Sequence, residues 1–150
     1  MAMNPSLTVR VAGTPGGIRE AAAAFDGFQA RHALSSEAVW PVQVALDEVL
    51  ANIVGHAYEG RGDGVIDLTF VLDAGTLTVT IADDGPAIDP LALPEPDTTT
   101  PLDDRQPGGL GIYLVKQLMR RVEYCRQGGR NCLVLVHRLG AQAPAGPAKD

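Results

Sequence analysis

Apolar and polar residues alternate along several short stretches of the chain, and this alternation predicts strands that bury one face. Five such stretches are expected as strands: Leu7–Val11, Val65–Leu72, Thr76–Ala82, Val122–Arg126 and Asn131–Leu139. Turn residues stand between two pairs of them, at Asp73-Ala74-Gly75 and at Gly128-Gly129. The pattern therefore predicts two hairpins, with the first strand at an edge of the sheet.

Helical spacing of apolar residues predicts three helices: Ile18–Ala33, Glu37–Tyr58 and Leu110–Arg120. A loop over Gly13–Gly17 is expected before the first of them. Ser35 offers an N-cap for the second helix. Pro41 stands near the start of that helix and predicts an irregular first turn, because proline lacks the N–H that an interior helical position needs.

The predicted elements run in the order strand, helix, helix, two strands, long loop, helix, two strands. Antiparallel hairpins with helices beside them predict an α+β fold, a two-layer α/β sandwich with a mixed, mostly antiparallel sheet and its helices on one face. The loop Pro86–Pro107 contains six prolines, and its length is typical of a functional lid. Residues 1–140 are expected to form one domain, and residues 141–150 a disordered tail.

Composition narrows the function classes. The chain has 150 residues, a formal net charge of -6 and a pI of about 4.9. One domain fits this length, and the negative charge argues against binding to nucleic acid. No apolar run approaches the roughly 18 residues of a membrane span, and the first ten residues lack the pattern of a secretion signal. We therefore expect a cytoplasmic protein without a membrane segment.

The two cysteines, Cys125 and Cys132, face each other if Gly128-Gly129 forms a two-residue turn. A cross-strand disulfide is one interpretation. We favour the other, reduced thiols buried in the sheet of a cytosolic protein. A zinc site is not indicated, because no C-x-x-C or H-x-x-x-H spacing accompanies the pair.

Glu48 and Asn52 lie four residues apart in the second predicted helix, so they are neighbours one turn apart. Most residues around them are apolar, and Gly55 falls on the same side of the helix. A solvated polar face would explain the pair without any function. The functional interpretation makes Asn52 an oxygen ligand of Mg²⁺ and Glu48 a general base beside a phosphate chain.

Asp83-Asp84-Gly85 ends the third predicted strand. Asp-Gly pairs are common in turns, which is the simpler interpretation. In the functional one, Asp83 lies on the floor of a pocket and accepts a hydrogen bond from an exocyclic amine such as that of adenine. Gly85 would let the backbone approach the base. A buried acceptor discriminates strongly between ligands, because a mismatch leaves it unpaired.

Gly108-Gly109-Leu110-Gly111 opens the last predicted helix. An irregular helix start is one interpretation. The other is a phosphate site, because the glycines expose backbone N–H groups at a helix end that carries about half a positive charge. The run is not a Walker loop, which needs a following Gly-Lys-Ser/Thr, and it does not close the β-α-β unit of a dinucleotide site.

In this order, the three motifs resemble those of the GHKL (Bergerat-fold) ATPases, and within them the anti-sigma-factor serine kinases of the RsbW and SpoIIAB type. The likeness extends over Leu7–Leu139 and is greatest in segments 46–58, 83–90 and 108–115. Residues 129–131 of the last hairpin are also similar to that family.

The resemblance implies an ATP site and a role for each motif. Glu48 would be the catalytic base that activates a serine hydroxyl, Asn52 the Mg²⁺ ligand and Asp83 the reader of adenine, while residues 91–107 would form the lid. The remaining nucleotide contacts would come from the glycine-rich motifs: Gly85, Ala87, Gly108, Gly109, Leu110 and Gly111. Ala87 replaces the glycine of the wider superfamily, which favours the anti-sigma subfamily.

The resemblance also implies a function. Such a kinase uses ATP and Mg²⁺, phosphorylates an anti-anti-sigma antagonist of the STAS type, and otherwise sequesters a sigma factor, usually as a homodimer. The alternative is a nucleotide-switched anti-sigma binding module without kinase activity. Glu48 favours the enzyme, because a pure binding module needs no base at that position.

Overall fold

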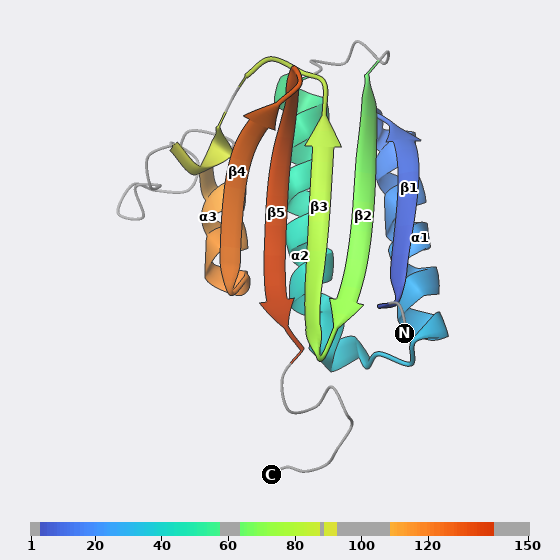
Figure 1. Ribbon diagram of the computed structural model, residues 1–150. Coiled ribbons are helices and arrows are strands. Elements are labelled where there is room, and N and C mark those ends of the chain that lie inside the picture. Colours follow the sequence, from blue (N-terminus) through green and yellow to red (C-terminus); the bar gives the residue numbers. More distant parts are fainter. Residues whose placement is uncertain (1–3, 58–63, 88, 93–108, 140–150) are drawn as a thin grey trace.

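The computed structural model describes residues 4–57, 64–87, 89–92 and 109–139. These residues form two layers, a five-stranded sheet and a set of helices that covers one of its faces (Figure 1). The strands lie in the order β1-β2-β3-β5-β4, and every neighbouring pair is antiparallel. The predicted α+β two-layer sandwich is confirmed.

Each strand lies where the alternation predicts it, within one residue at either end. The strands are β1 (Ser6–Ala12), β2 (Val65–Asp73), β3 (Thr76–Asp83), β4 (Arg121–Gln127) and β5 (Arg130–Arg138). The β2–β3 and β4–β5 hairpins form as expected, and β1 lies at one edge. The positive φ angles of Gly75, Gly128 and Gly129 supply the turn conformations that these hairpins need.

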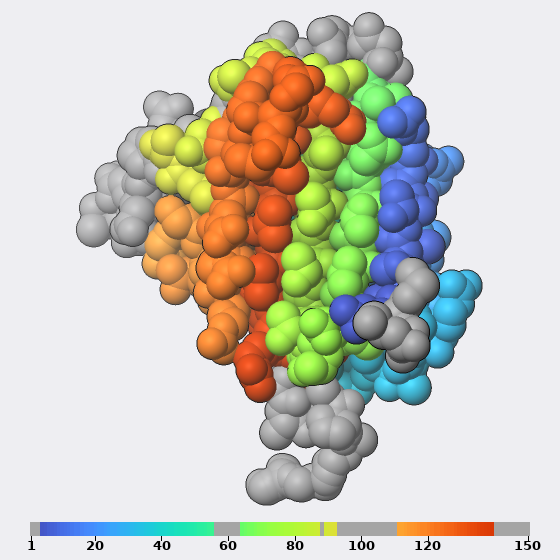
Figure 2. Space-filling view, viewed as in Figure 1, coloured from blue at the N-terminus to red at the C-terminus, as the bar shows by residue number. Residues whose placement is uncertain are grey.

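One face of the sheet packs against the helices, and its residues recur at every second position. In β3 the inward residues are Leu77, Val79 and Ile81, all essentially buried, followed in the same phase by Asp83. The aromatic part of the core joins α1 to β2, where Phe25 stacks on Phe70 with ring centroids 5.2 Å apart. The opposite face, turned away from the three α-helices, is the one seen in Figure 2. It is called the open face below.

The first helix, α1 (Pro15–Arg31), begins three residues earlier than predicted. Its N-cap is Thr14, whose hydroxyl oxygen accepts a hydrogen bond from the Gly17 N–H at 3.1 Å, and proline follows at the first helical position. Both are standard helix-start signals, so the expected loop over Gly13–Gly17 was wrong for most of its length. A Cβ at Gly17 would collide with the carbonyl of Ala12, so this glycine lets α1 pack closely on the end of β1.

The second helix, α2 (Ser36–Asn52), is capped by the Ser35 side chain and continues directly into a π-helical turn, η1 (Ile53–Ala57). The irregular first turn predicted from Pro41 is not seen. Pro41 lies inside a continuous helix, where its ring costs one backbone hydrogen bond near the N-terminus.

The segment Ser36–Gly55 is long and apolar enough to cross a membrane by length and composition alone, which the sequence interpretation did not anticipate. In the fold, 44% of its most apolar window is buried. Val42, Leu46 and Leu50 of this helix belong to the hydrophobic core. The apolar character of the segment is therefore accounted for by its central place in the helical layer.

The third helix, α3 (Gly109–Leu118), starts at the glycine-rich motif and ends two residues before the predicted boundary. A short 3₁₀ turn, η2 (Pro90–Ala92), lies close to β4. The predicted lid lies outside the described residues except for Leu91 and Ala92, and so do Gly108 and the predicted tail 141–150.

Cys125 and Cys132 are directly opposite each other on β4 and β5, as the two-residue turn predicts, and both are free thiols. The expectation that they are buried was wrong. Cys125 is exposed and Cys132 is half-buried. The reason is strand phase, because the neighbouring Tyr124 and Asn131 point into the molecule and the cysteines therefore point to the open face.

Candidate functional site

A cleft opens between the C-terminal part of α2 and the ends of the central strands. It has an empty volume of about 460 Å³, including its mouth. Its walls are mainly apolar with a few polar groups, which is typical of a small-molecule site. The lining residues come from most parts of the chain: Val49, Asn52, Ile53, Asp83, Pro86, Pro90, Ile112, Tyr124, Asn131 and Leu133.

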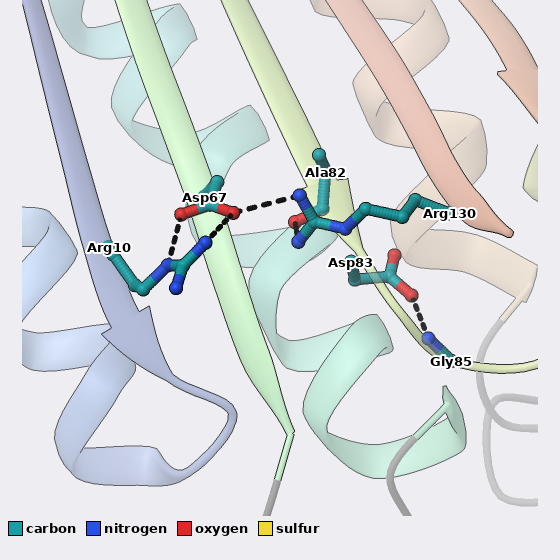
Figure 3. Close-up of polar contacts among 6 residues, drawn as sticks. All are labelled: Arg10, Asp67, Ala82, Asp83, Gly85 and Arg130. Atoms are coloured by element: carbon teal, nitrogen blue, oxygen red, sulfur yellow. Dashed lines mark hydrogen bonds and ion pairs between the residues drawn. The ribbon is translucent and has the colours of Figure 1, made fainter. Parts of the chain in front are cut away.

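Asp83 is the principal acidic group of this cleft. It is the last residue of β3 and only 4% exposed. Its Oδ1 accepts hydrogen bonds from the Gly85 N–H at 2.9 Å, drawn in Figure 3, and from Asn131 Nδ2 at 3.0 Å. Both donors are neutral, and neither bond uses Oδ2. Among the described residues, both hydrogen bonds to this carboxylate thus go to one oxygen, which leaves the other for a ligand.

Asn131 stands directly across from Asp83 on β5 and is 6% exposed. Its Nδ2 also donates to the Pro86 carbonyl at 2.8 Å. Its Oδ1 accepts from the Tyr124 hydroxyl and from Arg126, the latter at 3.1 Å. Because acceptors surround the nitrogen and donors surround the oxygen, only one orientation of the amide satisfies the cluster.

Arg126 ties this cluster to the loop after β3. Its guanidinium donates to the Gly85 carbonyl at 2.9 Å as well as to Asn131. The carbonyl and the N–H of Gly85 are therefore both held, the first by Arg126 and the second by Asp83. This arrangement fixes the backbone beside the cleft without placing a cation directly on the Asp83 carboxylate.

Sequence reasoning did not assign a role to Tyr124, Arg126 or Asn131, although it noted the last as part of a similar segment. A signal was present. Asn131 shares its strand phase with the apolar Leu133 and Leu135, which marks it as a polar residue at an inward position. The same signal identifies Asp83 on β3.

Asn52 is the last residue of α2 and lines the cleft, as the functional interpretation requires. The π-helical turn begins at the next residue, and such turns are frequent at functional sites. Asn52 and Asp83 are therefore brought to one cavity from a helix and a strand that are far apart in the sequence.

Glu48 lies one helical turn before Asn52, is half-buried, and does not line the cleft itself. Its Oε1 lies against Gly111, so that a Cβ at Gly111 would collide with this oxygen. The contact brings the Glu48 carboxylate to the first turn of α3. The neighbouring Asp47 is exposed.

The N-terminal turn of α3 begins with Gly109, Leu110 and Gly111, and it contains no acidic residue. The first N–H groups of a helix lack intrahelical partners, so this end offers donors to an anion. Ile112 of the same turn lines the cleft. Ala87 is exposed and does not line it, and Gly108 lies outside the described residues.

A second polar cluster lies on the open face, on the opposite side of the sheet from Asp83. Asp67 of β2 forms ion pairs with Arg10 at 2.7 Å and with Arg130 at 2.8 Å (Figure 3). Arg130 also donates to the Ala82 carbonyl at 3.4 Å. The hydrogen bond from Arg10, supported by Arg130, lowers the pKa of Asp67 despite the opposing effect of partial burial.

Comparison with protein families gives one match that covers most of the chain. Residues 11–137 match the sequence profile of the family described as the histidine kinase-like ATPase domain. This range extends from the end of β1 to the end of β5, so it includes the cleft and all its described lining residues.

Several bacterial kinases are similar in sequence. The serine/threonine-protein kinase BtrW of Bordetella bronchiseptica is 39% identical over 89 residues, which are 59% of this chain and 63% of BtrW. The serine-protein kinase RsbW of Listeria monocytogenes is 26% identical over 125 residues, covering 81% of this chain and 80% of that protein. RsbW of Bacillus pumilus is 32% identical over 109 residues, covering 69% and 67% respectively. The aligned part thus spans less than two thirds of BtrW.

A solved structure has the same fold. It contains the RsbU and RsbW domains of a Mycobacterium tuberculosis protein and superposes with a TM-score of 0.65 at 18% sequence identity. The match covers 91% of this chain and 33% of that longer one. At this identity the likeness supports the fold of the two-layer sandwich.

Proposed function

The chain belongs to the histidine kinase-like ATPase domain family, and on that basis we propose that it is an ATP-dependent protein serine kinase of the RsbW type. The observation that carries the proposal is Asp83, a buried carboxylate oriented by neutral donors at the end of an apolar cleft. Such a group suits the recognition of a ligand amine, because it is already desolvated and positioned.

The adenine of ATP fits the cleft by its chemistry. Its flat apolar faces would lie between walls that include Val49, Ile53 and Leu133, and its exocyclic amine would donate to Asp83 Oδ2. Asn131 and the Gly85 N–H occupy the other carboxylate oxygen, so the direction of the free oxygen is set before the nucleotide arrives. Discrimination against a base with a carbonyl in place of the amine follows.

The phosphates would extend toward the N-terminal turn of α3, whose N–H donors and helix dipole favour negative charge. Gly109 and Gly111 suit this role because they leave the backbone accessible, and Gly111 already lies against Glu48. Gly108, Leu110 and the lid over 91–107 would complete the enclosure. Ala87 would contribute at the outer rim.

Mg²⁺ fits the donor set at this end of the cleft. In proteins it takes few protein ligands and is bound largely through phosphate oxygens and water. Asn52 offers an amide oxygen there, and the described residues contain no cluster of three or more His, Cys, Asp or Glu that would form a separate metal cage. When bound, the ion would neutralise charge on the β- and γ-phosphates.

Glu48 is the proposed general base. The hydroxyl of a substrate serine gives its proton to the Glu48 carboxylate while its oxygen bonds to the γ-phosphorus, and the bond between that phosphorus and the oxygen of ADP breaks. The contact of Glu48 with Gly111 keeps the carboxylate beside the phosphate-binding turn. Catalysis would then consist mainly of positioning and charge stabilisation.

The proposed protein substrate is an anti-anti-sigma antagonist of the STAS type. The proposed second partner is a sigma factor, which this chain would otherwise sequester. Kinases named RsbW and BtrW are the relatives that support this assignment. We further propose a cytoplasmic location and a homodimeric state, with no nucleic acid or membrane as partner.

Two measurements test the proposal. Calorimetric titration with ATP, ADP and GTP, each with and without Mg²⁺, should give Mg²⁺-dependent binding of the adenine nucleotides and little binding of GTP. Incubation with γ-labelled ATP and STAS-domain proteins encoded in the same genome should then transfer label to a serine of one of them. ATP binding without any transfer would favour a nucleotide-switched binding module, and absence of nucleotide binding would refute the ATP site.

A further inference from the structure

Cys125 and Cys132 form a pair on the side of the sheet opposite the cleft. They are direct partners in the β4–β5 register, so their side chains leave the sheet on the same face. Their neighbours Tyr124 and Asn131 line the cleft. Because successive strand residues alternate between faces, the two thiols lie on the open face, behind the residues that hold Asp83.

The backbone geometry of this pair suits a covalent bond. Residues directly opposite in antiparallel strands have Cα atoms about 4.5–5.5 Å apart, and a disulfide spans Cα separations of about 4.4–6.8 Å. The next residue in the same row across the sheet is Ala82, which is small. A bridge can therefore form between the strands without a change of register.

The two thiols differ in their surroundings. Cys125 is exposed, whereas Cys132 is half-buried. Burial raises the pKa of the Cys132 thiol, the charge and hydrogen bonding of Cys125 add to this, and Arg130 acts in the opposite direction. An oxidant from solvent therefore meets Cys125 first, with Cys132 directly behind it as the second thiol.

We propose that Cys125 and Cys132 are a redox modification site at which hydrogen peroxide forms an intramolecular disulfide. The Cys125 thiolate attacks the peroxide oxygen, an S–O bond forms as the O–O bond breaks, and the leaving oxygen is released as water. The Cys132 thiolate then attacks the Cys125 sulfur, the S–S bond forms, and the S–O bond breaks to release a second water. Two thiols lose two electrons and two protons, and the peroxide gains them.

The bridge would lock the β4–β5 hairpin, which carries three residues of the polar cluster in the cleft: Tyr124, Arg126 and Asn131. Reversible disulfides in cytosolic proteins commonly act as redox sensors rather than as structural staples. Oxidation of the two thiols does not require ATP binding or phosphate transfer. The redox proposal can therefore be tested independently of the proposed kinase activity.

Intact-mass analysis of the purified, nucleotide-free chain treated with hydrogen peroxide tests the site directly. The sequence contains only two cysteines, so every thiol product can be assigned. The expected product is a monomeric chain lighter by two hydrogen atoms, without free thiol, that dithiothreitol returns to its starting mass. Unreacted thiols at a peroxide concentration that oxidises free glutathione, or disulfides only between chains, would overturn the proposal.

Single substitutions distinguish Cys125, the thiol that attacks the peroxide, from Cys132, the thiol that closes the disulfide. Cys132→Ser should leave Cys125 to accumulate as sulfenic and then sulfinic acid, because the second thiol is missing. Cys125→Ser should react several-fold more slowly than the parent chain, because the half-buried thiol is left alone. Equal rates for the two variants would contradict the assigned order of attack. Amide hydrogen exchange over 121–138 should slow after oxidation, and unchanged exchange would contradict the locking of the hairpin.

Discussion

Asp67 and Asp83 lie on neighbouring strands but in opposite surroundings. Asp67 faces the open side of the sheet, where two guanidinium groups neutralise it. Asp83 faces the helices, is nearly inaccessible to solvent, and is hydrogen-bonded by an amide and a backbone N–H. Arg126, which belongs to the same cluster, bonds to Asn131 and Gly85 instead.

The difference separates a structural carboxylate from one prepared for a ligand. The Asp67 carboxylate is paired with Arg10 of β1 and Arg130 of β5, so its role is to join strands together. Asp83 is only 4% exposed, and both of its hydrogen bonds go to Oδ1, so among the described residues Oδ2 is left to accept a hydrogen bond from a ligand in the cleft. A few polar groups held in a fixed orientation within an apolar cleft are typical of a ligand-binding site.

Substitution of both carboxylates tests this contrast and should give the largest effect. Asp83→Asn should weaken ATP binding by about 1,000-fold, because the amide oxygen is retained by Gly85 and Asn131 and the amide nitrogen then meets the amine of adenine, donor against donor. Asp67→Asn should leave the affinity within about twofold, since no ligand reaches it. Calorimetric titration of both variants with ATP measures the two affinities, and circular dichroism serves as the folding control. Equal losses would refute the distinction.

Glu48→Gln extends the comparison to a third carboxylate. Loss of the base should reduce phosphate transfer by about 100-fold or more, while the affinity for ATP stays within a few-fold because Glu48 does not line the cleft. Asp47→Asn is the matched control, since Asp47 is adjacent in sequence but exposed. Transfer measured with labelled ATP and the STAS-domain substrate gives the result. Retained transfer in the Glu48 variant would exclude it as the base.

The strands, the hairpins and the family could be predicted from sequence because local patterns determine them. Alternation placed every strand, and three motifs identified the GHKL resemblance that the family match confirms. The polar cluster around Asn131 could not be predicted in the same way. Its bonds join residues up to 48 positions apart, so the register of β3 against β5 had to be known first.

The predictions for the starts of the first two helices were wrong for a different reason. The start of α1 at Pro15 was missed because apolar periodicity was given more weight than the Thr14 cap and the proline after it. The continuous helix through Pro41 shows tertiary packing overriding a local propensity, because the following residue, Val42, is buried in the core.

The Tyr124 hydroxyl offers a smaller test of how Asp83 is oriented. Tyr124→Phe keeps the ring in the cleft wall but removes a donor to Asn131 Oδ1. The Asn131 amide is then held less firmly, and ATP affinity should fall by about tenfold, which corresponds to one hydrogen bond near a charged group. Asn131→Ala should cost at least as much. Affinity unchanged in both variants would show that Asp83 needs no such support.

Acid unfolding tests the structural role of Asp67. Asp67→Asn should lower the free energy of unfolding at pH 7 by about 1 kcal/mol or less, as for partly exposed ion pairs. The folded pKa of Asp67 is below the ordinary value of 3.8, so its contribution is complete above that value and is lost as pH falls through the folded pKa. Urea unfolding between pH 7 and pH 3 should show the parent and the variant converging. A constant difference across this range would contradict the assignment.

Substitution of His137 is expected to have the smallest effect on stability. Like Asp83, His137 lies on the helix-covered face of the sheet. It pairs with the buried Leu77, and among the described residues its Nδ1 is buried without a hydrogen-bond partner. Burial lowers its pKa from the ordinary 6.5, so the unfolded chain takes up the proton first as pH falls, and the stabilisation present above pH 6.5 declines below it. His137→Gln should flatten the decrease of unfolding free energy between pH 7 and pH 5.5, which urea unfolding at a series of pH values measures. An unchanged slope in the His137 variant would mean that burial of this imidazole does not contribute to the pH dependence of stability.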